Sequence, residues 1–324
     1  MRASWRPSAS EEVIRLRASL LQDIRAFLDR RGVLEVETPL MSSAATTDPN
    51  LASFSTRFRK QSLYLNTSPE YCMKRMLAEQ RVAIYQICKS FRADELGPMH
   101  NPEFTLLEWY QPGYDMHDLM SELADLVLML FDGHGPGPVA IKRCRYAELF
   151  LELAGLNPHR TTADICRSCA VAHGIRQPVG LSENVDEWLD WLLVELIVPS
   201  FPNDSLTFIY DFPESQAALA RCYRTPAGEL VAARFEMFAG QVELANGFDE
   251  LLDVNEQRRR FERENLARIG RGLEPSVIDE NLLRALEHGL PDCSGVAVGL
   301  DRLLMVLTGA ESIDQVLAFS FESV

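Results

Sequence analysis

Several side chains that could bind a nucleotide fall within residues 91–110, which read FRADELGPMHNPEFTLLEWY. An arginine such as Arg92 can hold a phosphate in fixed geometry, and an aromatic ring such as Phe104 can stack on a purine. His100, which could cover the outer phosphates, precedes Phe104 and Glu108 at four-residue spacing. Residues four apart on a strand share one face. Each residue alone would suit a charged hairpin rim, but the set together indicates a nucleotide site.

A pair of carboxylates lies on a predicted hairpin, FEMFAGQVELANGFDEL, at residues 235–251. With the turn at Ala239-Gly240, Glu236 falls directly opposite Glu243, where two carboxylates on one face repel each other. A bound divalent cation reverses that repulsion, and Mg²⁺ prefers a few protein oxygens with phosphate supplying the rest. We therefore expect a Mg²⁺ site here. Two solvated glutamates that diverge at a sheet surface are the alternative.

A third segment, SGVAVGLDRLLM at residues 294–305, carries two glycines and then an Asp-Arg pair. It has neither the Gly-Lys-Ser/Thr of a P-loop nor the GxGxxG order of a Rossmann turn. Glycine on a strand lets a flat ligand lie close to the backbone, and Arg302 on the following helix could reach a phosphate. A buried strand and helix with a surface ion pair is the alternative. Ala297 stands midway between Gly295 and Gly299, where a third glycine would continue the pattern.

Hydrophobic periodicity predicts the elements that must position these residues. We expect helices at about 10–31, 68–77, 117–131, 182–197, 255–269 and 279–288, and strands at 63–66, 84–91, 104–110, 206–212, 219–223, 229–238 and 241–248. Residues 95–103 and 133–145 are predicted to be loops. The pattern indicates an α+β fold, in which helices pack on a mostly antiparallel sheet and residues 1–324 form one domain with helical insertions.

The composition is that of a globular protein, with 47% hydrophobic and 24% charged residues. No apolar run approaches the roughly 18 residues of a membrane span, and the first ten residues lack the apolar core of a secretory signal. Seven scattered cysteines suit reduced thiols and a cytoplasmic location. Cys166 and Cys169, with His159 and His173, have passable zinc-ligand spacing, but there is no second CxxC pair.

The formal net charge of −15 argues against a large nucleic-acid footprint. One basic cluster, RRRFER at residues 258–263, is interrupted by glutamate and is better explained as a solvated helix face. The overall charge favours a partner with a locally basic surface.

Taken together, these segments resemble the catalytic core of the class II aminoacyl-tRNA synthetases. RGVLEVETPLM at 31–41 resembles motif 1, which makes the homodimer interface in that family. FRAD…HNPEF…E at 91–108 resembles motif 2, and GVAVGLDR at 295–302 resembles motif 3. Three separated motifs in the right order make the resemblance specific. It implies a synthetase-like fold over the whole chain, the use of ATP and Mg²⁺, and a homodimer.

Within the class, TSPEYCMKR at 67–75, HNPEFTLLEWY at 100–110 and ELANGFDEL at 243–251 resemble lysyl-tRNA synthetases. Those enzymes carry a preceding anticodon-binding OB-fold, and a first helix near residue 10 is expected to leave no room for one. The chain thus resembles the elongation factor P–(R)-β-lysine ligases. This resemblance implies that (R)-β-lysine, with α-lysine as the alternative substrate, is activated as an adenylate and transferred to a lysine of elongation factor P.

Two other functions stay open at this point. One is a truncated lysyl-tRNA synthetase-like enzyme that charges tRNA or another acceptor, although the missing OB-fold and the acidic charge make tRNA an unexpected partner. The other is a non-catalytic synthetase paralogue that acts as a binding module. A degenerate module is expected to lose motif arginines or metal carboxylates, and this sequence keeps them.

The resemblance also implies a role for each matching position. Arg92 and Arg302 are the catalytic arginines, of which Arg92 binds the α-phosphate and Arg302 closes the other face of ATP. The other implied ATP-binding residues are Asp94, His100, Asn101, Phe104, Glu243, Leu244 and Gly299, and the Mg²⁺ ligands are Glu236 and Glu243. The implied substrate-binding residues are Ser68 and Glu70 for the amine near the carboxylate, Glu108, Tyr110 and Glu250 for the distal ammonium, and Asn246, Phe248 and Ala297 for the pocket wall.

Two positions depart from the lysyl-tRNA synthetase pattern. Arg92-Ala-Asp94 stands where those enzymes read Arg-Asn-Glu, so Asp94 keeps the charge one methylene shorter, with either ATP or the substrate as its contact. Ala297 replaces their glycine and matches the ligase family. A methyl group at the pocket wall would reshape the room for the carbon chain of the substrate.

Overall fold

The computed structural model describes residues 5–135, 137, 140–177 and 180–324. Contacts between Cα atoms divide the chain into two compact units. Unit 1 comprises Met1–Pro136 and Leu251–Val324, and unit 2 comprises Gly137–Glu250. The organisation of both units as one catalytic domain remains a prediction.

The sheet in unit 1 holds the segments that the sequence marks as motif 2 and motif 3. β1 (Leu34–Glu35) runs parallel to β5 (Ile84–Phe91), β5 is antiparallel to β6 (Glu103–Pro112), and β6 is antiparallel to β12 (Cys293–Gly299). A small second sheet joins β2 (Met41–Ser42), β4 (Gln61–Leu65) and β3 (Ser55–Phe58). The predicted strands at 63–66, 84–91 and 104–110 are therefore present, with small shifts of their ends.

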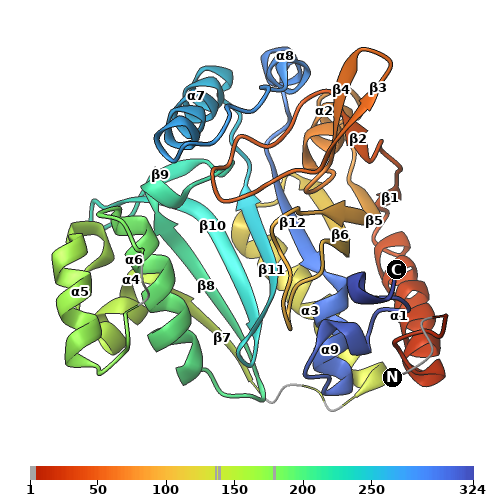
Figure 1. The fold of residues 1–324 in the computed structure, drawn as a ribbon, viewed down its shortest axis with the longest axis horizontal. Helices are drawn as coiled ribbons and strands as arrows, with labels where there is room; N and C mark the ends of the chain where they lie inside the picture. The colour runs from red at the N-terminus through yellow and green to blue at the C-terminus, as the bar shows by residue number, and fades with distance from the viewer. Residues whose placement is uncertain (1–4, 136, 138–139, 178–179) are drawn as a thin grey trace. The chain divides into compact units, whose positions relative to one another are not determined.

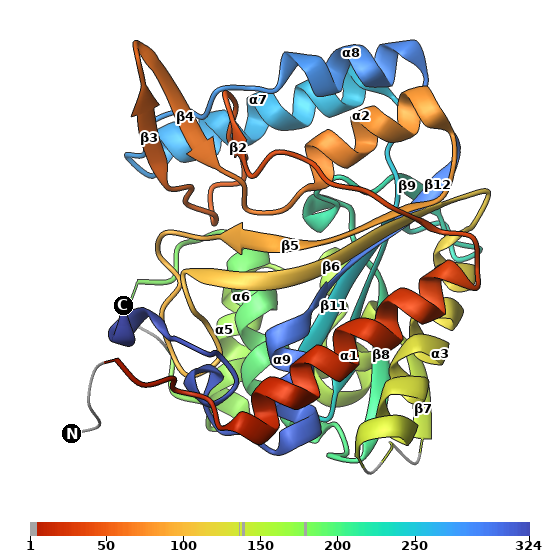
Figure 2. The same cartoon turned by 90° about the vertical axis from the view of Figure 1, so that its right-hand side faces the viewer.

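Two groups of helices complete unit 1, as Figure 2 shows. One group is α1 (Glu11–Asp29), α3 (Met116–His134) and α9 (Leu300–Thr308), of which α1 packs on α3 and α3 and α9 pack on the sheet. The other is α2 (Glu70–Gln80), α7 (Val254–Gly270) and α8 (Glu280–His288), which pack on one another. Helix α3 buries a continuous apolar side against the sheet, which explains why its periodicity was legible in the sequence.

Unit 2 is a sheet with helices gathered beside it (Figure 1). β7 (Ala140–Arg145) runs parallel to β8 (Ser205–Pro213), and β8, β10 (Leu230–Ala239) and β11 (Val242–Asp249) are antiparallel; β9 (Cys222–Arg224) pairs with β10. The helices are α4 (Tyr146–Leu149), α5 (Ala163–Ala172) and α6 (Val185–Leu192). Their apolar sides form one core with β8 and β10.

The α+β class with mostly antiparallel strands is confirmed, and the predicted helical insertion lies between β7 and β8. The predicted loop at 133–145 is wrong at both ends, because α3 continues to His134 and β7 begins at Ala140. The sequence of β7, AIKRCR, has basic side chains where a buried strand would be apolar. It pairs with β8 on one side and leaves its charged side chains exposed. Residues 136, 138 and 139 of that predicted loop lie outside the described residues.

Two further findings bear on the composition. All seven cysteines are free, in agreement with the reduced thiols expected. Among the described residues, no helix combines the length and apolar character needed to cross a membrane.

Candidate active site

One face of the unit 1 sheet collects many of the predicted site residues. Register pairs Ser90 with Phe104 across β5 and β6, and alternation puts Phe104, Glu108 and Tyr110 on the same side of β6. On the next strand, Ala297 lies directly opposite Glu108. Gly295 and Gly299 lie opposite Tyr110 and Leu106 on that same side of the sheet. A glycine or alanine of β12 therefore lies opposite each of Leu106, Glu108 and Tyr110.

The two predicted phosphate-binding arginines are linked through the loop between β5 and β6. Arg92 Nη1 lies 3.1 Å from Glu95 Oε1, and Glu95 Oε2 lies 3.9 Å from His100 Nε2. His100 Nε2 in turn accepts a hydrogen bond from Arg302 Nη2 at 2.7 Å. The Arg92 guanidinium carbon is 5.1 Å from the centre of the Phe104 ring. Two arginines and an aromatic ring thus lie near one loop. These are the groups suited to binding a nucleoside triphosphate.

His100 lies in the loop predicted at 95–103, so the argument that it shares a strand face with Phe104 fails, although its association with Arg302 holds. β6 begins only at Glu103, and His100 lies in the loop, where it pairs with Gly97 in an isolated bridge. The four-residue spacing therefore applies to Phe104 and Glu108 but not to His100. Glu95, which the sequence reading did not select, supplies the negative charge between Arg92 and His100.

The other motif 2 residues differ in how many of their polar atoms are hydrogen-bonded within the protein. Asn101 donates from Nδ2 to the Glu103 carbonyl at 2.7 Å and accepts from the Phe321 amide at 3.0 Å, so both ends of its side chain are used inside the protein. Asp94 is exposed in a turn after β5. Arg92 Nε is buried, and no group in the described part of the chain accepts its hydrogen bond, which leaves it available to a ligand.

Asp301 fixes the start of α9, just before Arg302. Its side chain is 2% exposed. It accepts from the Thr105 amide at 2.6 Å and from Arg17 Nη2 at 2.5 Å. The pair with Arg17 replaces the surface ion pair with Arg302 that the sequence left open. Asp301 thereby ties the helix that carries Arg302 to the strand that carries Phe104.

Ser68 and Glu70 lie together at the start of α2, and their role in binding an amine remains a prediction. The Ser68 hydroxyl accepts from the Glu70 amide at 3.2 Å. The Glu70 carboxylate is also paired with Lys74, whose Nζ lies 2.6 Å from Oε1 and whose side chain is 2% exposed. The sequence reading missed Lys74, although its spacing of four residues from Glu70 on a helix was a usable signal.

Glu108 and Tyr110 form a buried acidic pair on β6. Glu108 is 3% exposed and Tyr110 is 2% exposed. The Tyr110 hydroxyl donates to Glu108 Oε1 at 2.5 Å. Burying a carboxylate is costly unless cationic or hydrogen-bonding groups compensate. A carboxylate placed in this way is suited to receive an ammonium group.

In unit 2, the predicted pairing of Glu236 with Glu243 is wrong. Glu236 lies opposite Asn246, and Glu243 lies opposite Phe238. The turn is one residue later than predicted, at Gly240-Gln241, and a bulge near Leu244 shifts the register again. Gly240 has φ of +55°, and a Cβ there would lie 3.1 Å from the Asn203 carbonyl oxygen, so glycine fixes this turn.

The bulge leaves both carboxylates on the same face of the hairpin, in a diagonal relation in place of a direct one. Burial raises the pKa of Glu236 to about 7, Arg234 opposes that rise, and the charges of Glu243 and Asp190 add to it. The two glutamates therefore repel each other, as the sequence argument required. A divalent cation would relieve this repulsion, so the donor set fits Mg²⁺.

Arg234 is a residue of this hairpin that the sequence reading missed. Its Nη2 lies 2.6 Å from Glu236 Oε1, and its Nε donates to Asn246 Oδ1 at 3.3 Å. It stands two residues before Glu236, so the alternation of the strand gave a signal that both side chains share a face.

The remaining predicted residues of β11 vary in exposure. Leu244 is 2% exposed at the bulge, and Glu250 is 1% exposed, just after the strand, in a bridge with Ala220. Asn246 and Phe248 are partly buried. Their predicted roles toward the substrate are taken up below.

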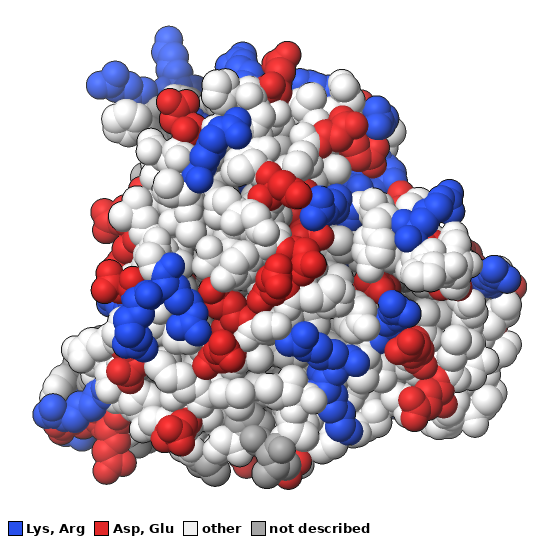
Figure 3. Space-filling model, turned by 180° about the vertical axis from the view of Figure 1, so that it is seen from behind, with Lys and Arg blue, Asp and Glu red and all other residues white. Residues whose placement is uncertain are grey.

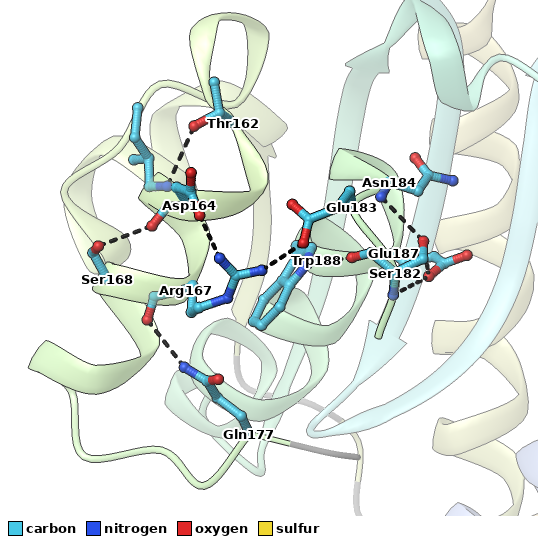
Figure 4. Close-up of polar contacts among 11 residues, drawn as sticks. Thr162, Asp164, Arg167, Ser168, Gln177, Ser182, Glu183, Asn184, Glu187 and Trp188 are labelled. Carbon is cyan, nitrogen blue, oxygen red and sulfur yellow. Dashed lines mark hydrogen bonds and ion pairs between the residues drawn. The ribbon is translucent and has the colours of Figure 1, made fainter. Parts of the chain in front are cut away.

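The two cysteines of the insertion take part in packing contacts. Cys169 Sγ donates to the Ala154 carbonyl at 3.3 Å, and Cys166 Sγ lies 3.5 Å from the Thr161 hydroxyl. In Figure 4, Arg167 points between Asp164 and Glu183 and lies over the Trp188 ring. Within the described ranges, no group of three or more His, Cys, Asp or Glu side chains is arranged to hold a metal ion, so zinc gains no support.

A comparison with known protein families decides the class. A sequence model described as tRNA synthetases class II (D, K and N) matches residues 2–323. The chain belongs to this family. The class II fold inferred from the three motifs is thereby confirmed, and the chain is an amino-acid-activating ligase of the class II synthetase type. ATP and Mg²⁺ are the ligands that this family generally uses.

Proposed function

We propose that this synthetase-family chain activates (R)-β-lysine as an adenylate and transfers it to the ε-amine of a lysine on elongation factor P. The observation that carries the preference for a basic amino acid is the buried pair of Glu108 and Tyr110. A carboxylate that is 3% exposed on the ligand-bearing face of β6 favours a cationic side chain as its partner. Ala297 opposite Glu108 supports the β-amino acid, because the ligase family shares this alanine.

The first step joins the carboxylate of the substrate to the α-phosphorus of ATP, and pyrophosphate leaves. Arg92 is proposed to hold the α-phosphate, Phe104 to stack on adenine, and Arg302 with His100 to hold the other phosphates. Asp94, Asn101, Leu244 and Gly299 are proposed to line the nucleotide. Catalysis then consists of positioning and of neutralising phosphate charge. Mg²⁺, held by Glu236 and Glu243, supplies part of that neutralisation when bound.

In the second step, the ε-amine of the acceptor lysine attacks the carbonyl carbon of the adenylate, forming an amide and releasing AMP. Ser68 and Glu70 are proposed to hold the amine near the carboxylate of the amino acid. Glu108, Tyr110 and Glu250 hold its distal ammonium, and Asn246, Phe248 and Ala297 line the pocket. Loss of the proton from the attacking amine is assigned to the phosphate of the adenylate.

A homodimer in the cytoplasm is the proposed form of the enzyme. The motif 1 region supports the dimer, because Leu34, Leu40 and Met41 are 56%, 37% and 50% exposed in the single chain. Exposed apolar side chains in one short segment are what an interface with a second copy would cover.

The surface charge does not favour tRNA as the acceptor. On the face that Figure 3 draws, Lys and Arg side chains are interspersed with Asp and Glu, with no continuous basic stripe.

The experiment is an intact-mass measurement of elongation factor P after incubation with the protein, ATP, Mg²⁺ and either (R)-β-lysine or α-lysine. The expected result is a mass gain of one lysyl residue, on a larger fraction of elongation factor P with (R)-β-lysine than with α-lysine. Removal of the metal by EDTA should abolish it. A parallel reaction contains tRNA and labelled amino acid. Label on tRNA alone would establish the synthetase alternative, and label on neither acceptor, without pyrophosphate exchange, would establish the non-catalytic one.

A further inference from the structure

Gln86 lies on β5, on the face that also carries Glu108, and has no role in the proposed reaction as stated so far. Its side chain is 3% exposed. Register places it directly opposite Glu108, which is directly opposite Ala297 on the next strand. An amide, a carboxylate and a methyl group thus form one row across three strands. Side chains in such direct opposition have Cβ atoms about 5 Å apart.

The hydrogen bonding of Gln86 is incomplete. Its Oε1 is buried, and no group in the described part of the protein donates a hydrogen bond to it. Most buried polar atoms in native proteins have a partner, and an exception requires an explanation. A ligand that brings its own N–H groups to this row would provide that partner.

A second buried glutamine in the same sheet shows the contrasting case. Gln111 lies on β6 but faces the opposite side, and its Nε2 donates to both oxygens of Glu122 at 2.9 and 3.1 Å. Its position is fully explained by packing inside the protein. Gln86 Oε1 has no such partner among the described residues, although both amides are buried on neighbouring strands.

We propose that Gln86 is a specificity-determining residue whose Oε1 accepts a hydrogen bond from the distal ammonium of the substrate, beside the Glu108 carboxylate. This inference rests on the proposed activation of a lysine-like amino acid. An ammonium group has three N–H donors, so it can use an acceptor in addition to Glu108. An amide supplies that acceptor without the repulsion that a second carboxylate opposite Glu108 would cause.

The first test is ATP–pyrophosphate exchange by Gln86→Met, which keeps the side-chain length and removes the acceptor. We expect the KM for (R)-β-lysine to rise about 10- to 100-fold, the range for a lost hydrogen bond to a charged group. The kcat should stay within about threefold. (R)-3-aminohexanoate lacks the distal ammonium, so its KM should not change, and discrimination between the two substrates should fall. Unchanged discrimination would overturn the inference.

Gln111→Met is the matched control, because it removes a buried amide from the opposite face. It should lower the melting temperature and leave the discrimination as in the wild type. If it reduced the discrimination as much as Gln86→Met, a general packing effect would account for both and the inference would be wrong.

Gln86→Glu provides a test that does not depend on Gln86→Met folding. It retains an acceptor but places a second carboxylate opposite Glu108. We expect a KM near the wild-type value above pH 8, and an acid limb of kcat/KM that moves up by about one pH unit because the two carboxylates repel. If the acid limb of the kcat/KM profile did not move, Gln86 would not be part of the ammonium site. Absence of exchange by the wild type with either lysine isomer would instead overturn the proposed function.

Discussion

The buried polar side chains on the two faces of the unit 1 sheet differ in how completely they are hydrogen-bonded. On the side covered by α3, Glu122 accepts from Trp109 Nε1 at 2.9 Å, from Gln111 Nε2 at 2.9 Å and from the Tyr114 hydroxyl at 3.4 Å. On the other side, Gln86 Oε1 is buried without a hydrogen-bond donor among the described residues. A saturated network stabilises the fold, whereas we have proposed that the unsatisfied Gln86 acceptor binds the substrate.

The same strand therefore carries both kinds of chemistry on alternate residues. Trp109 and Gln111 of β6 serve packing, and Glu108 and Tyr110 between them are proposed to serve substrate binding. Residue type does not separate these roles, since both faces carry buried glutamate, aromatic and amide groups. The difference lies in the amides, since Gln111 is fully engaged by Glu122 and Gln86 Oε1 has no donor among the described residues. Substitutions on each face should therefore affect different measurements.

The largest expected effect is on the α3 side. Glu122→Ala removes the common acceptor of Trp109 and Gln111 and should lower the free energy of unfolding by about 4 kcal/mol, since it breaks a buried, multiply bonded carboxylate site. Urea denaturation measures this loss, and the KM for the amino acid should stay unchanged in the folded enzyme. The control Asp125→Ala removes an exposed carboxylate 3.4 Å from Arg31 and should cost less than about 0.5 kcal/mol. Equal losses in both variants would contradict the contrast.

On the opposite face, Glu108→Gln should impair binding and spare stability. Neutralising the carboxylate should raise the KM for (R)-β-lysine about 100-fold, or about 3 kcal/mol, because a charge-assisted contact is lost. The KM for ATP and the free energy of unfolding should change little. Glu103→Gln, on the same strand but exposed and 3.4 Å from Lys89, is the control. A large loss of stability in Glu108→Gln with an unchanged KM would reverse the assignment of the two faces.

Glu264 on α7 is a partly buried carboxylate that accepts a hydrogen bond from the Thr47 hydroxyl. Burial raises its pKa from 4.5 to about 7. Folding therefore favours the protonated form, and stability is greatest below the unfolded pKa and falls as pH rises toward 7. This pKa shift corresponds to a loss of about 3 kcal/mol in the free energy of unfolding at high pH. Partial exposure of the side chain reduces that loss to about 2 kcal/mol.

Glu264→Gln should consequently match the wild type at pH 5 and be about 2 kcal/mol more stable at pH 8. Urea denaturation at the two pH values tests this, with exposed Glu262→Gln as the control. If the stability advantage of Glu264→Gln over the wild type were smaller at pH 8 than at pH 5, the predicted direction of the pH dependence would be wrong.

The smallest expected effect is a change of preference at the pocket wall. Ala297→Gly removes the methyl group opposite Glu108 and should shift the ratio of kcat/KM from (R)-β-lysine toward α-lysine about 10-fold, the usual effect of one carbon in a pocket. Pyrophosphate exchange with each isomer measures the ratio. Val296→Ala, on the other face of the same strand, should change stability and not preference. An unchanged ratio in Ala297→Gly would remove this residue from the specificity argument.

Much of the fold was predictable because its signals are local. The apolar periodicity of α3 and the alternation of β5 and β6 were sufficient to locate these elements within a few residues. β7 was missed because an edge strand with exposed basic side chains lacks a hydrophobic pattern. The predicted hairpin register failed because the turn lies one residue later, at Gly240-Gln241, and because a bulge near Leu244 shifts every pair beyond it.

For the candidate site, the sequence by itself determined the family and the chemical types of the groups: two arginines, an aromatic ring, paired carboxylates and an alanine within a glycine pattern. These follow from motifs whose residues are close along the chain. Only the tertiary structure decided which groups are saturated. Asp301 is bound by Arg17, Glu70 by Lys74, and Glu95 lies between Arg92 and His100, whereas Gln86 keeps an unsatisfied acceptor. Hydrogen-bond saturation depends on how residues distant in sequence are packed and buried, so residue spacing alone could not predict it.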